Sequence, residues 1–498
     1  MAYRVRITPP DRIIESREGE SLLDSLVRAG ISLSAPCGGK GRCGKCKARL
    51  ISGEVEGVTP DESGFILTCR ATALSDLTLE LCEQVGGGLV DFCADAPSGM
   101  AEGYGIAVDI GTTTLAGCLV DLSSGTILSE ASSVNPQSAL GADVLSRIEA
   151  ACHGKLDILA RLVRSGIRGI VDRLTRMLPS GAAVSEVAVA GNTTMLHLLL
   201  GVDPSGIGVA PFVPAFTEER VVEGREIGLD APTVRLLPSA SAYIGSDITA
   251  GAALLGIDGS ESALFIDIGT NGEILLSHEG RIYGASTAAG PALEGACIEC
   301  GTSGVLGAIS RVRLSDGRLD ITTVGGAEPI GICGSGLLDL VALLLDEGII
   351  EPDGCFNDGA SSPLLSRLRS DRFYLTEDIY LSLADIRQIQ LAKSAIRAGV
   401  ECLLNEVGID TDGLSVLYVA GGLGYYMDSR SAARVGLFPS ELLDRVKTVG
   451  NSSLGGACAS LFGDEARERI RRVAEKIQIV ELSTSPTFAD RFINNMFF

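Results

Sequence analysis

The sequence predicts an α/β protein of several domains: a small N-terminal domain, a short linker and two related lobes. Its 498 residues are enough for roughly two to four domains of ~100–200 residues each. Three observations support this class. A cysteine-rich loop follows a hairpin and a helix near the N-terminus, a strand–loop motif D-I-G-T occurs twice, and residues 155–178 and 384–404 carry apolar residues at helical spacing.

The composition argues against several classes of function. A net charge of −22 and an aromatic content of 4% without Trp disfavour nucleic-acid binding, which requires a basic face or stacking platforms. The first residues lack the apolar stretch of a secretory signal. The longest apolar runs, such as Leu337–Leu345, are too short to span a bilayer. We therefore expect a cytoplasmic protein with no membrane partner, whose 14 cysteines serve metal, redox or core positions rather than disulfides.

The N-terminal domain, expected over residues 1–84, begins with a hairpin and a helix. The alternating segments YRVRI and RIIES flank the turn signal PPD. Residues 20–29 then place four leucine and valine side chains on one helical face, and Gly30 follows as a stop signal. The Gly- and Ala-rich residues 85–103 are expected to link this domain to the rest of the chain.

Four cysteines of this domain have the spacing C-x5-C-x2-C-x22-C, formed by Cys37, Cys43, Cys46 and Cys69. We expect Cys69 on a strand-like segment. Four thiolates hold a [2Fe–2S] cluster, and plant-type ferredoxins space the first three as C-x4-C-x2-C, so the domain resembles ferredoxin variants with one extra residue. A structural zinc site is the alternative, but it usually shows two C-x2-C pairs and only one is present.

The cysteine loop also contains glycines and a basic run at residues 40–49. The glycines allow backbone N–H groups to turn toward the sulfur atoms. The cations neutralise the negative charge of a cluster, or they form a docking collar for an acidic redox partner. The sequence leaves both interpretations open.

An internal repeat organises the remainder of the chain. GIAVDIGTTTL starts at residue 105 and ALFIDIGTNGEI at residue 263, and each is followed by a strand that ends in glycine, EVAVAG at 186–191 and VLYVAGGLG at 416–424. The Asp-to-Gly separation is 82 residues in the first copy (109 to 191) and 154 in the second (267 to 421). We therefore expect lobes at 104–260 and 261–498, with an insertion of the second at about 287–385.

The two D-I-G-T loops are suited to binding phosphate. Their backbone N–H groups and Thr hydroxyls can face phosphate oxygens, and Asp109 and Asp267 can hold Mg²⁺ directly or through water. The VAGGLG segment allows close approach of a flat ligand such as adenosine. The predicted nucleotide contacts are Gly111, Thr112, Thr113, Thr114, Gly269, Thr270, Asn271, Gly272, Gly421, Gly422 and Gly424.

Two glutamates are further catalytic candidates. Glu273 closes the second loop and could position water or Mg²⁺, although a solvated strand residue is an equally simple interpretation. Glu294, in the segment GPALEG, is a candidate for orienting water. Cys333 and Ser335, in ICGSG, belong either to a partner-facing surface or to a turn on the nucleotide side.

The duplicated loops resemble the phosphate-1, phosphate-2 and adenosine loops of the actin/Hsp70/sugar-kinase superfamily, which implies two RNase H-like lobes that bind ATP and Mg²⁺. Joined to a β-grasp ferredoxin domain, they resemble the reductive activators of corrinoid-dependent enzymes. The segments GNTTMLHLLLG, GPALEGACI, ICGSGLLDLVA and FADRFINNMFF carry this resemblance over nearly the whole chain.

The resemblance implies an ATP-hydrolysing reductive activase. Its cluster would reduce an inactive Co(II) corrinoid protein to Co(I), an upstream low-potential donor would supply the electrons, and homodimers would be common. Two alternatives remain. One is an activator like those of 2-hydroxyacyl-CoA dehydratases, whose [4Fe–4S] cluster is shared between subunits, and the other is a nucleotide-binding redox sensor without turnover. The roles of Cys297 and Cys300 stay open between a redox pair and incidental thiols.

Overall fold

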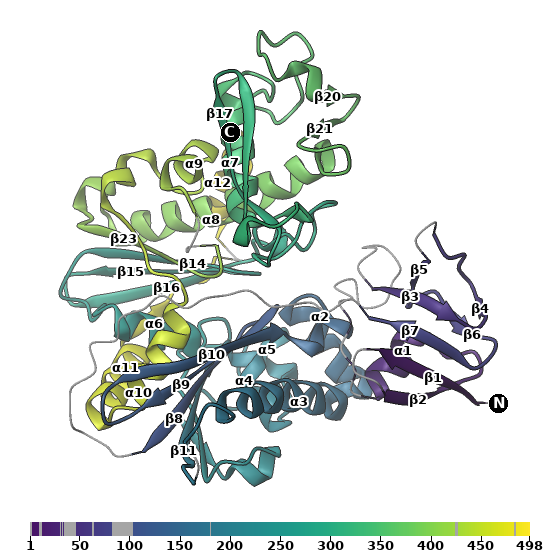
Figure 1. Ribbon diagram of the computed structural model, residues 1–498. Coiled ribbons are helices and arrows are strands. Elements are labelled where there is room, and N and C mark those ends of the chain that lie inside the picture. The colour runs from purple at the N-terminus through teal and green to yellow at the C-terminus, as the bar shows by residue number, and fades with distance from the viewer. Residues whose placement is uncertain are drawn as a thin grey trace.

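The computed structural model describes residues 2–8, 12–29, 31, 33, 46–61, 64–81, 103–179, 181–423, 427–482 and 485–498. It has three parts (Figure 1). The N-terminal domain (purple) lies beside a first sheet and its helices (blue), and a second sheet with its helices (teal to yellow) lies above them in that view. The predicted α/β multidomain class is confirmed.

The N-terminal domain is a five-stranded sheet, in the order β2-β1-β7-β3-β5, that is covered by helix α1. The predicted hairpin is present, with Val5 opposite Ile14. The elements are β1 (Ala2–Thr8), β2 (Arg12–Arg17), α1 (Leu22–Arg28), β3 (Lys47–Ser52), β4 (Val55–Glu56), β5 (Phe65–Leu67), β6 (Thr72–Ala73) and β7 (Leu77–Glu80).

Helix α1 forms for local reasons that the sequence contains. The Ser21 side chain caps its first turn by accepting a hydrogen bond from the Asp24 N–H at 3.1 Å, and the leucines on one face are buried. The core of this domain includes Ala139 and Leu162, which belong to the next part of the chain. The N-terminal domain is therefore packed directly against the first lobe.

The first lobe is a six-stranded sheet in the order β10-β9-β8-β11-β13-β12. Helices α3 and α4 pack on one face, and helices α6 and α10 pack on the other. Its elements are β8 (Tyr104–Ile110), β9 (Thr114–Asp121), β10 (Thr126–Val134), η1 (Pro136–Ala139), α2 (Val144–Ala150), η2 (Ala151–Lys155), α3 (Leu156–Thr175), β11 (Val184–Gly191), α4 (Thr193–Leu200), α5 (Ser205–Gly208), β12 (Arg220–Val222), η3 (Gly224–Ile227), β13 (Thr233–Leu236) and α6 (Ser246–Leu254).

The second lobe has a related sheet in the order β24-β23-β14-β15-β16-β25. Its elements are β14 (Ala263–Ile268), β15 (Gly272–His278), β16 (Arg281–Thr287), η4 (Pro291–Glu294), α8 (Leu383–Val407), η7 (Thr411–Gly413), β23 (Val416–Ala420), α9 (Ser429–Val435), η8 (Ser440–Arg445), β24 (Val446–Thr448), α10 (Ser452–Ser460), α11 (Asp464–Lys476), β25 (Ile477–Ile479) and α12 (Pro486–Asn494). Helices α3 and α8 coincide with the two predicted amphipathic helices.

Two small sheets and a buried helix lie between η4 and α8 in the sequence. They comprise β17 (Ala308–Ser315), β18 (Arg318–Thr323), η5 (Val324–Gly326), β19 (Gly331–Ile332), α7 (Gly334–Asp346), η6 (Leu365–Arg367), β20 (Leu368–Arg369), β21 (Arg372–Tyr374) and β22 (Tyr380–Ser382). Helix α7 is apolar on nearly all sides because it lies inside the core of the second lobe.

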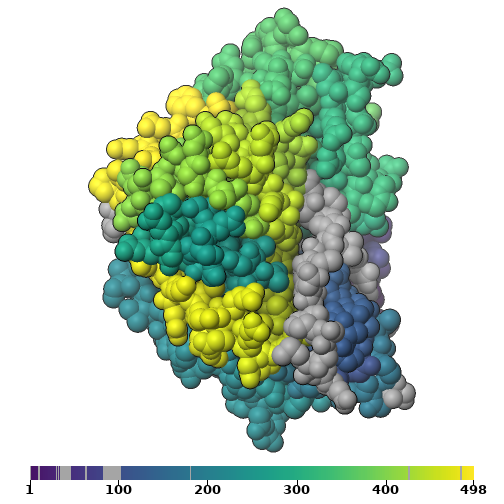
Figure 2. All heavy atoms as spheres, turned by 90° about the vertical axis from the view of Figure 1, so that its left-hand side faces the viewer, coloured from purple at the N-terminus to yellow at the C-terminus, as the bar shows by residue number. Residues whose placement is uncertain are grey.

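The two lobes meet through helices α6 and α10. The backbones approach closely at Gly456, where an added Cβ would lie 2.3 Å from the Ala250 carbonyl oxygen, so only glycine fits. In Figure 2, one group of yellow atoms, from the C-terminal region of the chain, lies between teal atoms of the second lobe and blue atoms of the first lobe. Because α10 lies between strands β24 and β25 of the second sheet in the sequence but packs on the first sheet, it connects the two halves. None of the helices in the described part is both long and apolar enough to cross a membrane.

Candidate functional site

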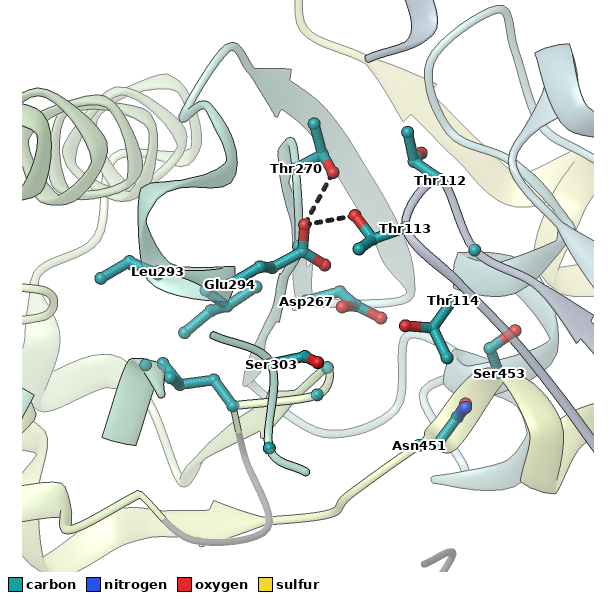
Figure 3. A pocket seen from close by; sticks show the side chains of 18 of the residues that line it. Thr112, Thr113, Thr114, Asp267, Thr270, Leu293, Glu294, Ser303, Asn451 and Ser453 are labelled. Carbon is teal, nitrogen blue, oxygen red and sulfur yellow. Dashed lines mark hydrogen bonds between the residues drawn. The ribbon is translucent and has the colours of Figure 1, made fainter. Parts of the chain in front are cut away.

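A cavity of about 300 Å³ lies between the two lobes, and both D-I-G-T loops open into it (Figure 3). Strands β8 and β14 are equivalent central strands of the two sheets and bring Asp109 and Asp267 to the same space. The predicted residues that line it are Asp109, Gly111, Thr112, Thr113, Thr114, Asp267, Gly269, Thr270, Asn271, Glu273, Glu294, Gly421 and Gly422. Gly272 starts β15 beside it, and Gly424 lies outside the described residues.

Close backbone packing explains two of the glycines. At Gly111, a Cβ would lie 2.6 Å from the Thr114 carbonyl oxygen, within the tight turn of the first loop. Gly421 has a φ of +96°, and its Cβ would lie 2.3 Å from the Ile268 carbonyl oxygen and 2.9 Å from the Asp267 carboxylate. The loop after β23 therefore lies against the second phosphate loop, and a side chain at Gly421 would separate them.

Glu294 joins the two loops. Its Oε2 accepts a hydrogen bond from the Thr113 hydroxyl of the first loop at 3.0 Å and from the Thr270 hydroxyl of the second at 2.8 Å (Figure 3). Thr113 lies one position beyond the D-I-G-T motif and Thr270 is the threonine of that motif, so a single carboxylate contacts both halves of the site. A phosphate group that bound the same hydroxyls would compete with Glu294.

The Asp109 carboxylate is held by the start of helix α10. Its Oδ2 accepts from the Asn451 side chain at 2.9 Å, and its Oδ1 accepts from the Ser453 hydroxyl at 2.7 Å. By contrast, no hydrogen bond from the described residues reaches the Asp267 carboxylate. The charged groups that act on it, Asp247, Asp109 and Glu294, all repel it. Asp267 therefore has its oxygen atoms available for a cation.

Five carboxyl groups share the site: Asp109, Asp247, Asp267, Glu273 and Glu294. Burial raises the pKa of every one of them, and for Asp247 it acts together with the charge of Asp109 to raise the pKa to about 7. Burial and the neighbouring carboxylates raise the pKa of Asp267 and Glu273 well above the usual range. Buried oxygen ligands that repel one another are suited to a divalent cation such as Mg²⁺.

Glu273 is not a solvated strand residue. It lies directly opposite Asp267 in the β14–β15 register and is 8% exposed. Its position therefore supports the interpretation that Glu273 belongs to the site.

Sequence reasoning missed Asp247, Asn192, Asn451 and Ser453. Asp247 lies at the start of α6, after a segment of small residues, and Asn192 donates a hydrogen bond to the Thr112 hydroxyl at 3.1 Å. Asn192 follows Gly191, the last residue of β11, and Asp247 lies two residues after Gly245, which precedes α6. A glycine beside the end of a strand or the start of a helix was therefore the available signal for both residues. Asn451 follows Gly450 and caps α10, so it carried the same local signal, but nothing local shows that it reaches Asp109 across 342 residues of sequence.

Part of the cavity lining is apolar. Leu293, Val324 and Leu423 line it, together with the turn at residues 333–335. Cys333 and Ser335 therefore lie on the cavity side. This position agrees with the interpretation that they belong to a turn on the nucleotide side rather than to a partner-facing surface. Apolar side chains together with a set of carboxylates and hydroxyls match a ligand with a flat base and a phosphate chain.

The cysteine site is described in part. Cys46 is buried beside β3, and its carbonyl oxygen accepts hydrogen bonds from the Thr68 N–H at 2.9 Å and the Thr68 hydroxyl at 3.0 Å. These bonds bring Cys69, the next residue, close to Cys46. Cys69 lies in a turn rather than on a strand, because β5 ends at Leu67. Cys37 and Cys43 lie outside the described residues.

The fold and site thus define an ATPase-like core of two related lobes with a ferredoxin-like domain attached. Three family models match the chain. They are the 2Fe-2S iron-sulfur cluster binding domain over residues 5–74, the RACo middle region over 104–260 and the C-terminal domain of RACo, the ASKHA domain, over 261–498. The chain carries a 2Fe–2S domain and belongs to the RACo family of reductive activators, which confirms the predicted family.

Individual relatives agree with this assignment. The chain is 34% identical to corrinoid activation enzyme RamQ of Eubacterium limosum, over 83% of this chain and 73% of that protein. It is 25% identical to the [Co(II) methylated amine-specific corrinoid protein] reductase of Methanosarcina barkeri, over 78% and 76% of the two chains. A solved structure of a reductive activator for corrinoid, iron-sulfur protein matches all of this chain and 98% of its own, with a TM-score of 0.75 and 29% identity.

Proposed function

We propose that this protein uses ATP to reactivate a corrinoid protein, reducing its Co(II) to Co(I) with electrons from its own [2Fe–2S] cluster. Residues 1–84 form the electron-carrying unit, and residues 104–260 and 261–498 form the two halves of the nucleotide site. Cys37, Cys43, Cys46 and Cys69 hold the cluster, which supplies one electron at a time when bound. A low-potential donor reloads it. The resemblance to the family further suggests a homodimer, which sedimentation would test.

The observation that carries the proposal is the cavity between the lobes. Thr112–Thr114 and Gly269–Gly272 offer hydroxyl and N–H donors to phosphate oxygens from both sides. Asp109 and Asp267 hold Mg²⁺, directly or through water, with Glu273 beside them. The glycines at 421 and 422, with Gly424, flank the adenosine. Glu294 orients the attacking water once the phosphates take the Thr113 and Thr270 hydroxyls from it.

ATP is needed because the electron transfer is uphill. Plant-type ferredoxins have potentials near about −400 mV, and we expect the Co(II)/Co(I) couple of the partner to lie lower. Each ~59 mV of mismatch in a one-electron transfer lowers the equilibrium constant about tenfold. ATP acts through differential binding: one nucleotide state favours the partner in the conformation that accepts the electron, and the other releases it.

A chain of contacts connects the nucleotide site to the cluster domain. Asn135 donates to the Gly111 carbonyl oxygen at 2.8 Å through its side chain and to the Thr113 carbonyl oxygen at 2.8 Å through its backbone. Helix η1 begins at the next residue, and its last residue, Ala139, belongs to the core of the N-terminal domain. A shift of the first phosphate loop would therefore move a surface on which the cluster domain rests.

The test is reduction of a purified Co(II) corrinoid protein under anaerobic conditions, followed by its visible spectrum. We expect Co(I) to accumulate only with this protein, a reductant and hydrolysable ATP together. ATP turnover stimulated by the corrinoid protein distinguishes an activase from a redox sensor that only binds nucleotide. Failure of every corrinoid partner, with intact cluster and ATPase, would favour an activator of another low-potential enzyme.

A further inference from the structure

A groove of about 530 Å³ lies at the junction of the cluster domain and the first lobe, away from the cavity between the lobes. One wall is the end of α1, and the other is the exposed side of α3 with η3 and the glycine that follows it. Five arginines and one glutamate line it: Arg28, Arg161, Arg164, Arg168, Arg225 and Glu226. In a chain with a net charge of −22, such a concentration of positive charge is a local exception.

Three of these arginines come from α3 at spacings of three and four residues, which places them on one face of the helix. Each is held in the same way. The Nε of Arg161 donates to the Asp157 carbonyl oxygen at 3.3 Å, that of Arg164 to the Leu199 carbonyl oxygen at 2.8 Å, and that of Arg168 to the Gly228 carbonyl oxygen at 2.7 Å.

These bonds fix the guanidinium groups without neutralising them. Arg28 and Arg225 pair with Glu20 and Glu223, whereas the ion pairs among the described residues include none of the three α3 arginines. Their terminal nitrogen atoms remain able to bind carboxylates in the planar, two-point geometry that guanidinium favours.

The floor of the groove is apolar. Val27, Ala29, Ile158, Leu162 and Ile227 contribute to it. An apolar centre with a charged rim is the anatomy of a protein-docking surface rather than of a site for a small phosphate compound.

The groove is also close to the electron carrier. The N–H of Leu23, in the first turn of α1, donates to the Thr68 carbonyl oxygen at 3.1 Å, next to Cys69. From Leu23 to Arg28 the helix rises by about 8 Å. A protein seated in the groove would thus lie beside the cluster domain, on the opposite face of the first sheet from α6 and α10.

We propose that this groove, which we call the arginine groove, is the docking site for the acidic electron donor that reloads the cluster. The inference rests on the proposed function, because it assumes that the protein receives electrons through its own cluster. Carboxylates of the donor pair with Arg161, Arg164 and Arg168, and an apolar side chain between them reaches the floor.

A reduced flavodoxin is a suitable probe, because it is small, acidic and has flavin absorption bands of its own. One electron leaves its anionic hydroquinone, which becomes the neutral semiquinone, and enters the oxidised cluster; no bond is formed or broken. Two readouts are measured: the affinity for oxidised flavodoxin by calorimetry at low and physiological salt, and the rate of semiquinone formation by stopped flow.

The test variant is Arg161→Ala/Arg168→Ala, which removes two exposed charges. We expect about a tenfold loss in affinity and rate at low ionic strength, within the range over which steering changes association, and a weaker dependence on salt. Arg161→Lys/Arg168→Lys should recover the salt dependence. Arg176→Ala, which removes a charge from the end of the same helix outside the groove, is the matched control and should behave as wild type.

Three outcomes would overturn the proposal. The first is unchanged flavodoxin binding in the double variant, and the second is an equal loss in Arg176→Ala. The third is a double variant that reacts with flavodoxin at the normal rate but no longer binds the corrinoid protein, or no longer binds inorganic pyrophosphate. This result would assign the groove to the ligand whose binding is lost. Cobalt reduction driven by dithionite should remain in all variants, so its failure in wild type would count against the proposed function and not against the groove.

Discussion

Asp247→Asn should stabilise the ligand-free protein, and increasingly so as the pH rises. The folded protein raises the pKa of Asp247 from 3.8 to about 7, through burial first and the charge of Asp109 second. A carboxyl group with a raised pKa contributes stability that is complete below its unfolded pKa and is lost as the pH rises through its folded pKa. The loss is about 1.5 kcal/mol at pH 5 and about 4 kcal/mol at pH 8, at 1.36 kcal/mol per pKa unit.

The assay is denaturation of the ATPase lobes by urea between pH 5 and pH 8, without nucleotide or Mg²⁺. The gain of Asp247→Asn over wild type should grow by about 2.5 kcal/mol across this range. Mg²⁺ with nucleotide should reduce the difference, because the cation removes the repulsion that the asparagine removes. Asp230→Asn, at an exposed position, is the control. A gain that does not change with pH, or that the control reproduces, would refute the reasoning.

Three further predictions concern the two functional centres. Purified protein should contain about two iron and two acid-labile sulfide per chain; zinc without sulfide would contradict the cluster. Asp267→Asn should lower ATP hydrolysis and sustained Co(I) formation while dithionite still bleaches the cluster, and Cys43→Ser should damage the cluster while nucleotide affinity survives. Gly421→Ala should lower nucleotide affinity and thermal stability, whereas Gly422→Ala, whose Cβ meets no atom within 4 Å, should leave thermal stability unchanged; equal effects would refute the packing argument.

The sequence predicted those parts of the site that lie on a repeated local pattern. Asp109 and Asp267 were found because each follows an apolar strand and precedes a small-residue turn, a combination with a strong local signal. The sequence predicted Glu294 as a site residue but not its hydrogen bonds, because nothing in GPALEG shows that its side chain reaches Thr113, 181 residues away. Asn451 and Asp247 were missed because only the packing of α10 on α6 brings them to the cavity. Local pattern therefore located the loops, and tertiary packing decided which distant side chains complete them.

Asn135 offers a test of whether the two centres communicate through the first lobe. Besides its bonds to the first phosphate loop, its Oδ1 accepts from the Gln137 N–H at 3.0 Å and so caps η1, the helix against which the cluster domain packs. Asn135→Ala removes the side-chain bond to Gly111 and the cap, each worth about 1 kcal/mol, but leaves the cluster ligands and the carboxylates in place.

We expect Asn135→Ala to keep its iron content and to bind ATP with only a modest loss of affinity, while the cobalt reduction supported by each ATP hydrolysed falls. The measurement is the ratio of Co(I) formed to phosphate released, read together with dithionite bleaching of the cluster. A defect confined to the nucleotide site would lower both quantities together, and a defect confined to the cluster would show in the bleaching. Ser138→Ala, in the same short helix, is the control. If the ratio in Asn135→Ala equals that of wild type, the contacts through η1 do not carry the coupling, and the nucleotide must act on the partner through the second lobe.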